Sequence, residues 1–265
     1  MDATSTDTLF AVEEGQGNDA PIVLLHGFGA GAHVWANVQK ALAGEIRTLA
    51  YDLPGHGRSI NCTGFERSGK MAGAVTEDLA GRGIGKVHLV GHSMGGAVAT
   101  LIALRTPALV ASMTLLAPGG YGPEINHRLL RRYAGATTHH EMLGALENMF
   151  GWNAEIPAPM VEALVESRNI PNCVDKLKII LDKMLRQEGA DLVQGTFWRG
   201  ELAELQMPVK VLWGTQDRVL PTRQAHRLPP MFAAHVFENT GHMLIDERGE
   251  DVVSLVRQNI RAATG

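Results

Sequence analysis

Short apolar runs alternate with helical patterns along the first half of the chain. Four runs of this kind cover residues 22–25, 47–51, 86–90 and 112–116. Each is short and largely apolar, which is typical of a parallel strand that is buried on both faces. The alternation of such runs with helical segments predicts βαβ units and a mostly parallel sheet flanked by helices.

The segments between these runs repeat apolar residues at helical spacing. Val34, Trp35, Val38 and Leu42 share one helix face, and residues 97–104 are apolar almost all round. A helix without a polar face has to be covered by other elements of the protein. We therefore expect a deeply buried helix soon after the third of the four runs.

The alternation stops at residues 118–120, which read Pro-Gly-Gly. Residues 121–204 then show helical patterns punctuated by Gly and Pro, with no convincing strand. Strand patterns return at residues 209–213 and 235–237, and residues 249–263 have the apolar stripe of an amphipathic helix. The α/β pattern is therefore interrupted by a helical block and then resumes.

The length of the chain fits one domain that carries an insertion. A chain of 265 residues can form one well-buried core and still have room for a sizeable extra segment. We expect residues 1–120 and 205–265 to form the α/β core, and residues 121–204 to form a helical lid.

Composition and charge exclude several classes of protein. Hydrophobic residues make up 45% of the chain and the formal charge is -4, without the concentrated basic face that nucleic acid requires. Cys62 and Cys173 fit neither a disulfide framework nor a zinc site. Residues 1–7 lack the basic start of a secretory signal, and no apolar stretch approaches the ~20 residues that cross a bilayer. We expect a cytoplasmic protein that acts on a small molecule without a metal, a cofactor or a membrane partner; its oligomeric state is left open.

The strongest local motif is Gly-His-Ser-Met-Gly at residues 91–95. It matches G-x-S-x-G and lies between a predicted strand and the predicted buried helix, which is the context of a nucleophile elbow. The sharp turn leaves room for only small residues two positions before and after Ser93, and it exposes the hydroxyl at the carboxyl end of a strand. We expect Ser93 to be a catalytic nucleophile.

A serine hydroxyl needs a base within hydrogen-bonding reach, and the base needs a group that orients it. His242 lies in the loop between the last strand pattern and the last helix, and Asp217 lies just past the strand that ends at Trp213. Ser93, Asp217 and His242 therefore all follow carboxyl ends of strands, in the chain order that α/β hydrolases use. We expect them to form a catalytic triad.

Acyl transfer also needs donors that stabilise the negative charge on the reacting oxygen. One candidate is the backbone N–H of Met94, directly after the nucleophile. The other is the backbone N–H of Phe28, in the His-Gly-Phe-Gly loop at residues 26–29 after the first core strand. By position, these two groups are expected to form the oxyanion hole.

The same loop offers an alternative interpretation. Residues 27–32 fit G-x-G-x-x-A, and Asp52 ends the following strand, as in a dinucleotide-binding fold. The bulky Phe28 and the loop at residues 53–59 are foreign to that pattern, and it leaves the Ser, Asp and His without a role. The hydrolase interpretation is therefore favoured.

Together these motifs resemble the α/β-hydrolase family over nearly the whole chain. The resemblance is carried by residues 26–29, 52–59, 91–96, 213–217 and 241–242. It implies an eight-stranded, mostly parallel sheet, the triad Ser93, Asp217 and His242, and a helical lid inserted after the sixth strand. Only residues 8–14 precede the first core loop, which is too few for the family's usual pair of opening strands.

Within the family, the chain is most similar to lid-bearing bacterial esterases, enol-lactonases and the hydrolase-like acyltransferase subunits linked to acetoin dehydrogenase. The sequence shows no lipoyl-type domain. The C–C bond hydrolases of the family usually have Asn where His92 stands, and an aromatic residue where Met243 and Leu244 follow the histidine. Cleavage of an ester or a lactone is therefore favoured.

Large apolar residues in the predicted lid indicate a small or medium apolar acyl or alcohol group, or else they only attach the lid to the core. These candidates for the substrate pocket are Met149, Phe150, Trp152, Phe197 and Trp198. Two other functions stay open. One is C–C hydrolysis, perhydrolysis or transfer to a thiol by the same triad, and the other is a ligand receptor that retains the fold without catalysis.

Overall fold

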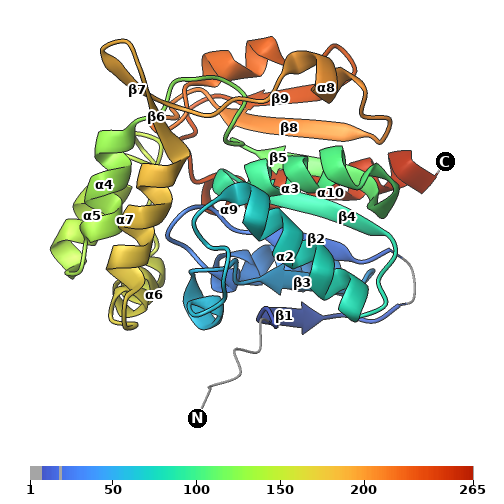
Figure 1. The fold of residues 1–265 in the computed structure, drawn as a ribbon, viewed down its shortest axis with the longest axis horizontal. Coiled ribbons are helices and arrows are strands. Elements are labelled where there is room, and N and C mark those ends of the chain that lie inside the picture. Colours follow the sequence, from blue (N-terminus) through green and yellow to red (C-terminus); the bar gives the residue numbers. More distant parts are fainter. Residues whose placement is uncertain (1–7, 18–19, 265) are drawn as a thin grey trace.

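A seven-stranded sheet forms the centre of the part of the chain that the computed structural model describes, residues 8–17 and 20–264 (Figure 1). The strand order is β1-β3-β2-β4-β5-β8-β9, and every pair except β1 with β3 is parallel. This confirms the mostly parallel sheet. The strands are β1 (Ala11–Glu14), β2 (Ile22–Leu25), β3 (Thr48–Tyr51), β4 (Val87–His92), β5 (Val110–Leu116), β8 (Val209–Gly214) and β9 (Ala233–Phe237).

The expectation of eight strands is wrong for the described residues. A single opening strand, β1, pairs along β3 from Ala11 opposite Tyr51 to Glu14 opposite Thr48. As a result, β5 is the fifth strand of this chain but holds the sixth position of the eight-stranded plan, and the insertion follows it. The prediction about residues 1–7 falls outside the described residues.

Helices cover both faces of the sheet. In Figure 1, α2 and α3 lie on the side nearer the viewer, whereas α10 lies behind the strands. The buried helix expected after β4 is α3, in which Val98, Ala99 and Ile102 are almost wholly covered. The helices of the core are α1 (Ala36–Ala43), α2 (Ser68–Gly81), α3 (Met94–Arg105), α9 (Leu244–Glu247) and α10 (Gly249–Thr264).

The insertion between β5 and β8 lies to one side of the sheet (Figure 1). Its helices begin at recognisable signals, since Thr138 and Glu141 form a capping box and Asn126 accepts a hydrogen bond from the Leu129 N–H. The helices of the insertion are α4 (His127–Gly135), α5 (His139–Leu146), α6 (Ala158–Arg168), α7 (Cys173–Met184) and α8 (Arg199–Ala203).

The insertion also contains a hairpin that the sequence pattern did not predict. Strands β6 (Leu185–Glu188) and β7 (Asp191–Gln194) pair antiparallel across a turn at Gly189, whose φ is 60°. The exposed, mostly polar β6 lacks the apolar alternation by which a strand is recognised. Tertiary contacts hold the hairpin, because the buried Gln194 amide accepts from the Gly120 N–H and donates to the Gly122 carbonyl.

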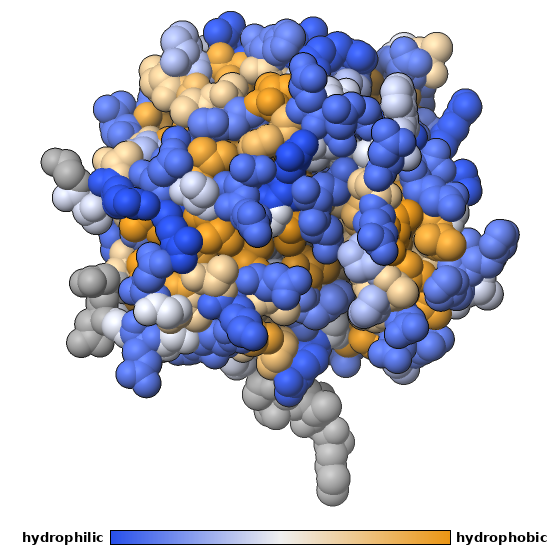
Figure 2. Space-filling view, turned by 180° about the vertical axis from the view of Figure 1, so that it is seen from behind, coloured by the Kyte–Doolittle hydropathy of each residue, from blue (hydrophilic) through white to orange (hydrophobic). Residues whose placement is uncertain are grey.

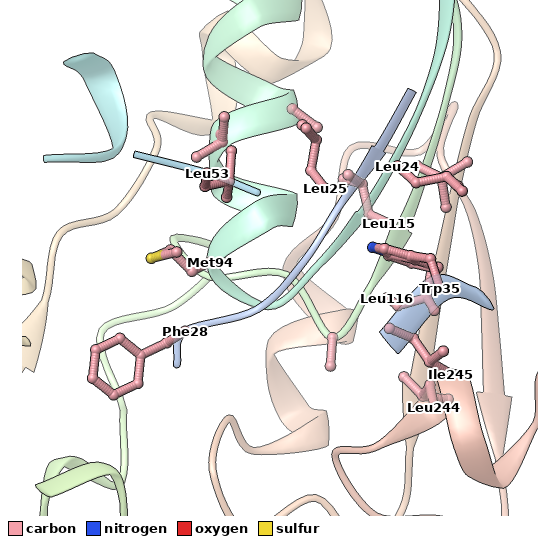
Figure 3. Packing of buried hydrophobic residues seen from close by; sticks show 14 of the residues in the cluster. Leu24, Leu25, Phe28, Trp35, Leu53, Met94, Leu115, Leu116, Leu244 and Ile245 are labelled. Carbon is pink, nitrogen blue, oxygen red and sulfur yellow. The ribbon is translucent and has the colours of Figure 1, made fainter. Parts of the chain in front are cut away.

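The core gathers apolar side chains from both faces of the sheet. Trp35 and Trp213 are completely buried. Figure 3 shows part of this cluster, with Trp35, Leu244 and Ile245 on one side and Phe28 and Met94 on the other. The outer surface seen from behind is mostly hydrophilic, with apolar residues showing between polar ones (Figure 2). No helix among the described residues has the length and apolarity needed to span a membrane.

Candidate active site

Ser93 occupies a strained turn between β4 and α3. Its backbone has φ 53° and ψ −116°, a conformation that non-glycine residues rarely adopt. A Cβ atom on Gly91 would lie 2.5 Å from the Gly95 carbonyl oxygen, and one on Gly95 would overlap the Leu25 carbonyl. The Ser93 N–H donates to the Leu116 carbonyl at 2.9 Å. The strand, the helix and the two glycines thus hold the turn in the shape expected of a nucleophile elbow.

His242 and Asp217 form a hydrogen-bonded pair. The Nδ1 atom of His242 lies 2.8 Å from Asp217 Oδ2, and both side chains are buried. The other carboxylate oxygen, Oδ1, accepts from the N–H groups of Val219 and Leu220 at 2.8 and 2.9 Å. These bonds fix the carboxylate, so the ring is oriented with Nδ1 as the donor and Nε2 available as a base.

Ser93 and His242 line one cavity of about 30 Å³, roughly the volume that one water molecule takes up. No hydrogen bond joins the Ser93 hydroxyl to His242 among the residues that the structure describes. Such bonds often shorten only when substrate binds. The wall of the cavity is mostly apolar and includes Phe28, Val34, Leu130, Tyr133, Met149, Met243, Ile245 and Asp246.

Two backbone donors are available beside the elbow. The N–H groups of Phe28 and Met94 have no acceptor within the described part of the chain. Phe28 lines the same cavity as Ser93, and Met94 is the first residue of α3. Unpaired N–H groups in a buried setting are costly unless a ligand satisfies them, which suits an oxyanion hole.

Asp52 has a structural role that excludes the dinucleotide interpretation. Its carboxylate accepts from the Ala32 N–H at 2.7 Å and from the Arg58 N–H at 2.8 Å. A side chain on Gly57 would collide with this carboxylate. Asp52 therefore joins the loop after β2 to the loop after β3 and is not free to bind a ribose.

Two buried histidines stabilise the same pair of loops. His26 Nε2 accepts from the Leu53 N–H at 2.9 Å, and His56 Nε2 accepts from the Gly29 N–H at 3.2 Å. Burial lowers the pKa of His26 to about 4 and lowers that of His56 well below its usual value. Both rings therefore act as neutral acceptors that hold the backbone of the loops after β2 and β3.

His92, the variable residue of the elbow, contacts both the backbone and the ring of His242. Its Nε2 donates to the His242 carbonyl oxygen at 2.8 Å, and the two ring centroids lie 4.9 Å apart. Burial, followed by the nearby His242, lowers the pKa of His92 to about 3. The ring is therefore neutral in the folded protein and must take up a proton when the protein unfolds in acid.

The depressed pKa of His92 predicts a loss of stability in acid. The unfolded chain binds this proton below its ordinary pKa of 6.5, whereas the folded chain does so only near 3, so stability present above 6.5 is lost as the pH falls. Between about pH 7 and pH 5, this one group should lower the free energy of unfolding by about 2 kcal/mol.

Urea unfolding of wild type and His92→Asn at both pH values measures this contribution. The variant should lose about 2 kcal/mol less than wild type between the two conditions. The control is His139→Gln, which changes an exposed residue of α5 and should reproduce the wild-type difference. An equal loss in wild type and His92→Asn would contradict the prediction.

Glu247 is a site residue that the sequence analysis did not identify. Its carboxylate accepts from the N–H groups of Gly241 at 2.9 Å and Met243 at 3.2 Å, on either side of His242, and from that of Gly151 at 2.8 Å. The His242 N–H itself donates to the Met149 carbonyl at 2.6 Å. Glu247 therefore joins the histidine loop to the insertion. Only its spacing of five residues after His242 could have pointed to it.

Arg168 of α6 also reaches the site from the insertion. Its guanidinium is almost completely buried, donates from Nη1 to the Gly29 carbonyl at 2.9 Å and lies 4.9 Å from the centre of the Tyr133 ring. Its Nε and Nη2 have no hydrogen-bond partner among the described residues. A buried cation with unpaired N–H groups is costly, and Arg168 does not line the cavity that holds Ser93. No sequence motif identified it.

The five residues predicted to line the substrate pocket lie in different parts of the structure. Met149 lines the cavity that holds Ser93, and Phe150 is buried nearby but does not line it. Phe197 lines a different cavity. Trp152 and Trp198 are 72% and 69% exposed, so neither faces the nucleophile in this conformation. Among the described residues there is no group of three or more potential metal ligands.

Comparison with known proteins finds similarity along nearly the whole chain. Residues 22–255 match the model of the alpha/beta hydrolase family. A 2-hydroxy-6-oxononadienedioate/2-hydroxy-6-oxononatrienedioate hydrolase of Burkholderia vietnamiensis is 34% identical over 94% of this chain and 89% of its own length. The dihydrolipoyllysine-residue acetyltransferase component of the acetoin cleaving system of Pseudomonas putida is 32% identical over 91% of this chain. The match spans only 63% of that relative's length.

Solved structures show the same fold at lower sequence identity. A meta-cleavage product hydrolase from Pseudomonas fluorescens is 20% identical with a TM-score of 0.83, covering 96% of this chain and 94% of that one. A carboxylesterase from Bacillus subtilis is 21% identical with a TM-score of 0.79, covering 94% of this chain and 86% of that one. At these identities the likeness concerns the fold alone.

Proposed function

This chain belongs to the alpha/beta hydrolase family, and on that basis we propose that it cleaves a small or medium carboxylic ester or lactone through an acyl-enzyme on Ser93. The observation that carries the proposal is the combination of a strained Ser93 with a buried pair of His242 and Asp217 at the same cavity. This combination supplies a nucleophile, a base and a group that orients the base.

The first half of the reaction forms the acyl-enzyme. His242 Nε2 takes the proton of the Ser93 hydroxyl while Oγ attacks the carbonyl carbon, and the N–H groups of Phe28 and Met94 stabilise the oxyanion. The imidazolium then protonates the departing alcohol oxygen as the carbon–oxygen bond breaks. Asp217 stays ionised and stabilises the charged ring through Nδ1.

The second half restores the enzyme. Water enters in place of the alcohol, His242 removes one of its protons, and the hydroxyl oxygen attacks the acyl carbon. Collapse of the second tetrahedral intermediate breaks the bond to Ser93 Oγ, which recovers its proton from His242. The products are a carboxylic acid and the free serine.

We assign residues 121–204 the role of a lid over a core formed by residues 1–120 and 205–265. Leu130, Tyr133 and Met149 of the insertion line the cavity with Ser93. Because this cavity of about 30 Å³ is far smaller than the ~300–1,000 Å³ of ordinary ligand pockets, these side chains have to move before an ester can enter. A cytoplasmic location and a small-molecule substrate stay predictions from the sequence.

A second candidate function is cleavage of a carbon–carbon bond next to a ketone. The Burkholderia relative is named for action on an oxo-dienedioate, a substrate with two carboxylates. The 34% identity to that relative favours this candidate. His92 and Met243 favour the ester, since the C–C hydrolases that this chain resembles usually differ at both positions.

A fluorophosphonate probe tests the proposed nucleophile directly. We expect the probe to label Ser93 in the folded protein, because only an activated serine attacks it, and we expect no labelling after denaturation. Peptide mapping identifies the labelled residue. Absence of labelling would contradict the enzyme proposal and favour a ligand receptor.

A substrate panel then separates the two reactions. Nitrophenyl esters from acetate to octanoate are compared with a 2-hydroxy-6-oxo-dienedioate at equal concentration. The proposal requires a higher kcat/KM for an ester of short or medium chain length. A higher value for the dienedioate would replace it with the second candidate.

A further inference from the structure

A second cavity of about 560 Å³ opens next to the nucleophile elbow, on the side of α3 that faces α2 and the β6–β7 hairpin. It is an open groove, unlike the small cavity that holds Ser93 and His242. The residues that line it are Glu66, Arg67, Ser68, Gly69, Lys70, Met94, Ala97, Leu101, Arg105, Gly119, Gly120, Lys183, Met184, Gln194, Gly195, Thr196 and Phe197.

Positive charge is concentrated in this groove. Arg67, Lys70, Arg105 and Lys183 line it, against a single carboxylate at Glu66. The whole chain, by contrast, has a formal charge of -4. A local excess of cations in an acidic protein attracts anions to one place on its surface.

These cations have little compensation from the protein. Neither Arg67 nor Lys183 forms an ion pair within the described part of the chain, and the Lys70 ammonium lies 3.8 Å from the Glu66 carboxylate. Arg105 lines the groove, donates a hydrogen bond from Nη1 to the Gly69 carbonyl and forms no ion pair among the described residues. The guanidinium and ammonium groups are therefore available to a ligand.

One end of the groove lies beside the nucleophile elbow. Met94, which lines the groove, directly follows Ser93, and the Gly119 N–H donates to the Ser93 carbonyl at 3.0 Å. Met94, Ala97 and Phe197 make this end apolar. The basic residues lie at the start of α2 (Arg67 and Lys70) and at the ends of α3 (Arg105) and α7 (Lys183). The groove therefore suits an extended ligand with an apolar stem and an anionic end.

We propose that this groove binds a phosphate group on the alcohol or thiol portion of the substrate. The inference rests on the proposed acyl-enzyme function and adds the chemistry of the leaving group. The cavity beside Ser93 is small and mostly apolar, whereas the groove is larger and basic, so the groove suits the polar portion of the substrate on one side of its ester or thioester carbonyl. Arginine and lysine are the side chains that bind phosphate oxygens best.

Direct binding tests the groove without depending on catalysis. Calorimetric titration of the Ser93→Ala protein with pyrophosphate should show saturable binding that weakens with added salt. The added double substitution Arg67→Glu and Lys183→Glu should weaken it by about tenfold or more. The control substitution Arg261→Glu, on α10, should leave it unchanged. Absence of binding, or equal affinity in the double variant, would overturn the proposal.

Matched substrates test the link to Ser93. An acyl thioester of phosphopantetheine and the same thioester of pantetheine differ only in the phosphate. Wild type should have the lower KM for the phosphorylated compound, and the double variant should lose that difference, whereas the control Arg261→Glu should retain it. Equal KM values in wild type would overturn the proposal. Failure to hydrolyse either compound would count against the proposed function, and pyrophosphate binding would still decide the groove.

A vesicle-binding experiment distinguishes a lipid headgroup from a soluble compound as the source of the phosphate. Cosedimentation with vesicles that contain phosphatidic acid, compared with phosphatidylcholine vesicles, reports whether the groove takes a phosphate at a lipid surface. Binding that requires Arg67 and Lys183 would identify a lipid headgroup as the source. Pyrophosphate binding without vesicle binding would identify a soluble phosphorylated substrate.

Discussion

Replacement of Ser93 by alanine is expected to lower kcat/KM toward a nitrophenyl ester by about 10⁴-fold to 10⁶-fold. In the proposed mechanism the hydroxyl oxygen forms the acyl-enzyme, so the variant would retain only the oxyanion donors and substrate binding. Those groups account for the residual rate above that of water. The measurement is the initial rate at substrate concentrations well below KM.

The same variant should fold normally. Ser93 has a strained backbone with φ 53°, and alanine at this position would have the same strain. The free energy of unfolding should therefore change by less than about 1 kcal/mol. Ser254→Ala, an exposed serine on α10, is the matched control and should keep full activity. A Ser93→Ala enzyme as fast as wild type would show that another residue is the nucleophile.

Replacement of Asp217 by asparagine is expected to lower kcat by about 10⁴-fold. The carboxylate accepts the proton of His242 Nδ1 at Oδ2 while Oδ1 accepts from the Val219 and Leu220 N–H groups. If the asparagine oxygen keeps those two N–H bonds, its amide nitrogen faces the ring and can only donate. His242 would then carry its proton on Nε2 and could not accept one from Ser93.

Kinetics at several pH values distinguish loss of the base from loss of the fold. In the asparagine variant, activity should partly recover at high pH, where hydroxide can replace the base, while urea unfolding shows a folded protein. Asp251→Asn is the matched control, because Asp251 also follows His242 in the chain but, among the described residues, forms an ion pair only with Arg248, at 3.9 Å. A larger loss of kcat in Asp251→Asn than in Asp217→Asn would assign the orienting acid elsewhere.

The strands and the elbow could be predicted because their signals are local. A run such as Ile22–Leu25 is apolar throughout, and a strand buried on both faces requires that pattern. Gly91 and Gly95 flank Ser93 because larger side chains would collide with backbone atoms there. This steric requirement is therefore visible in the five-residue motif at residues 91–95. The β6–β7 hairpin has no such local signal, since its stability comes from the contacts of Gln194 with residues some seventy positions away.

The sequence by itself determined the parallel sheet, the elbow and the Ser, Asp, His order, because each follows from periodicity or from sterics within a few neighbouring residues. Only the tertiary structure decided which insertion side chains face Ser93, so that Met149 does and the exposed Trp152 does not. It also assigned Glu247 to the histidine loop and gathered Arg67, Arg105 and Lys183 into one groove. These contacts join residues far apart in the chain, where hydropathy and spacing carry no information about which side chains meet.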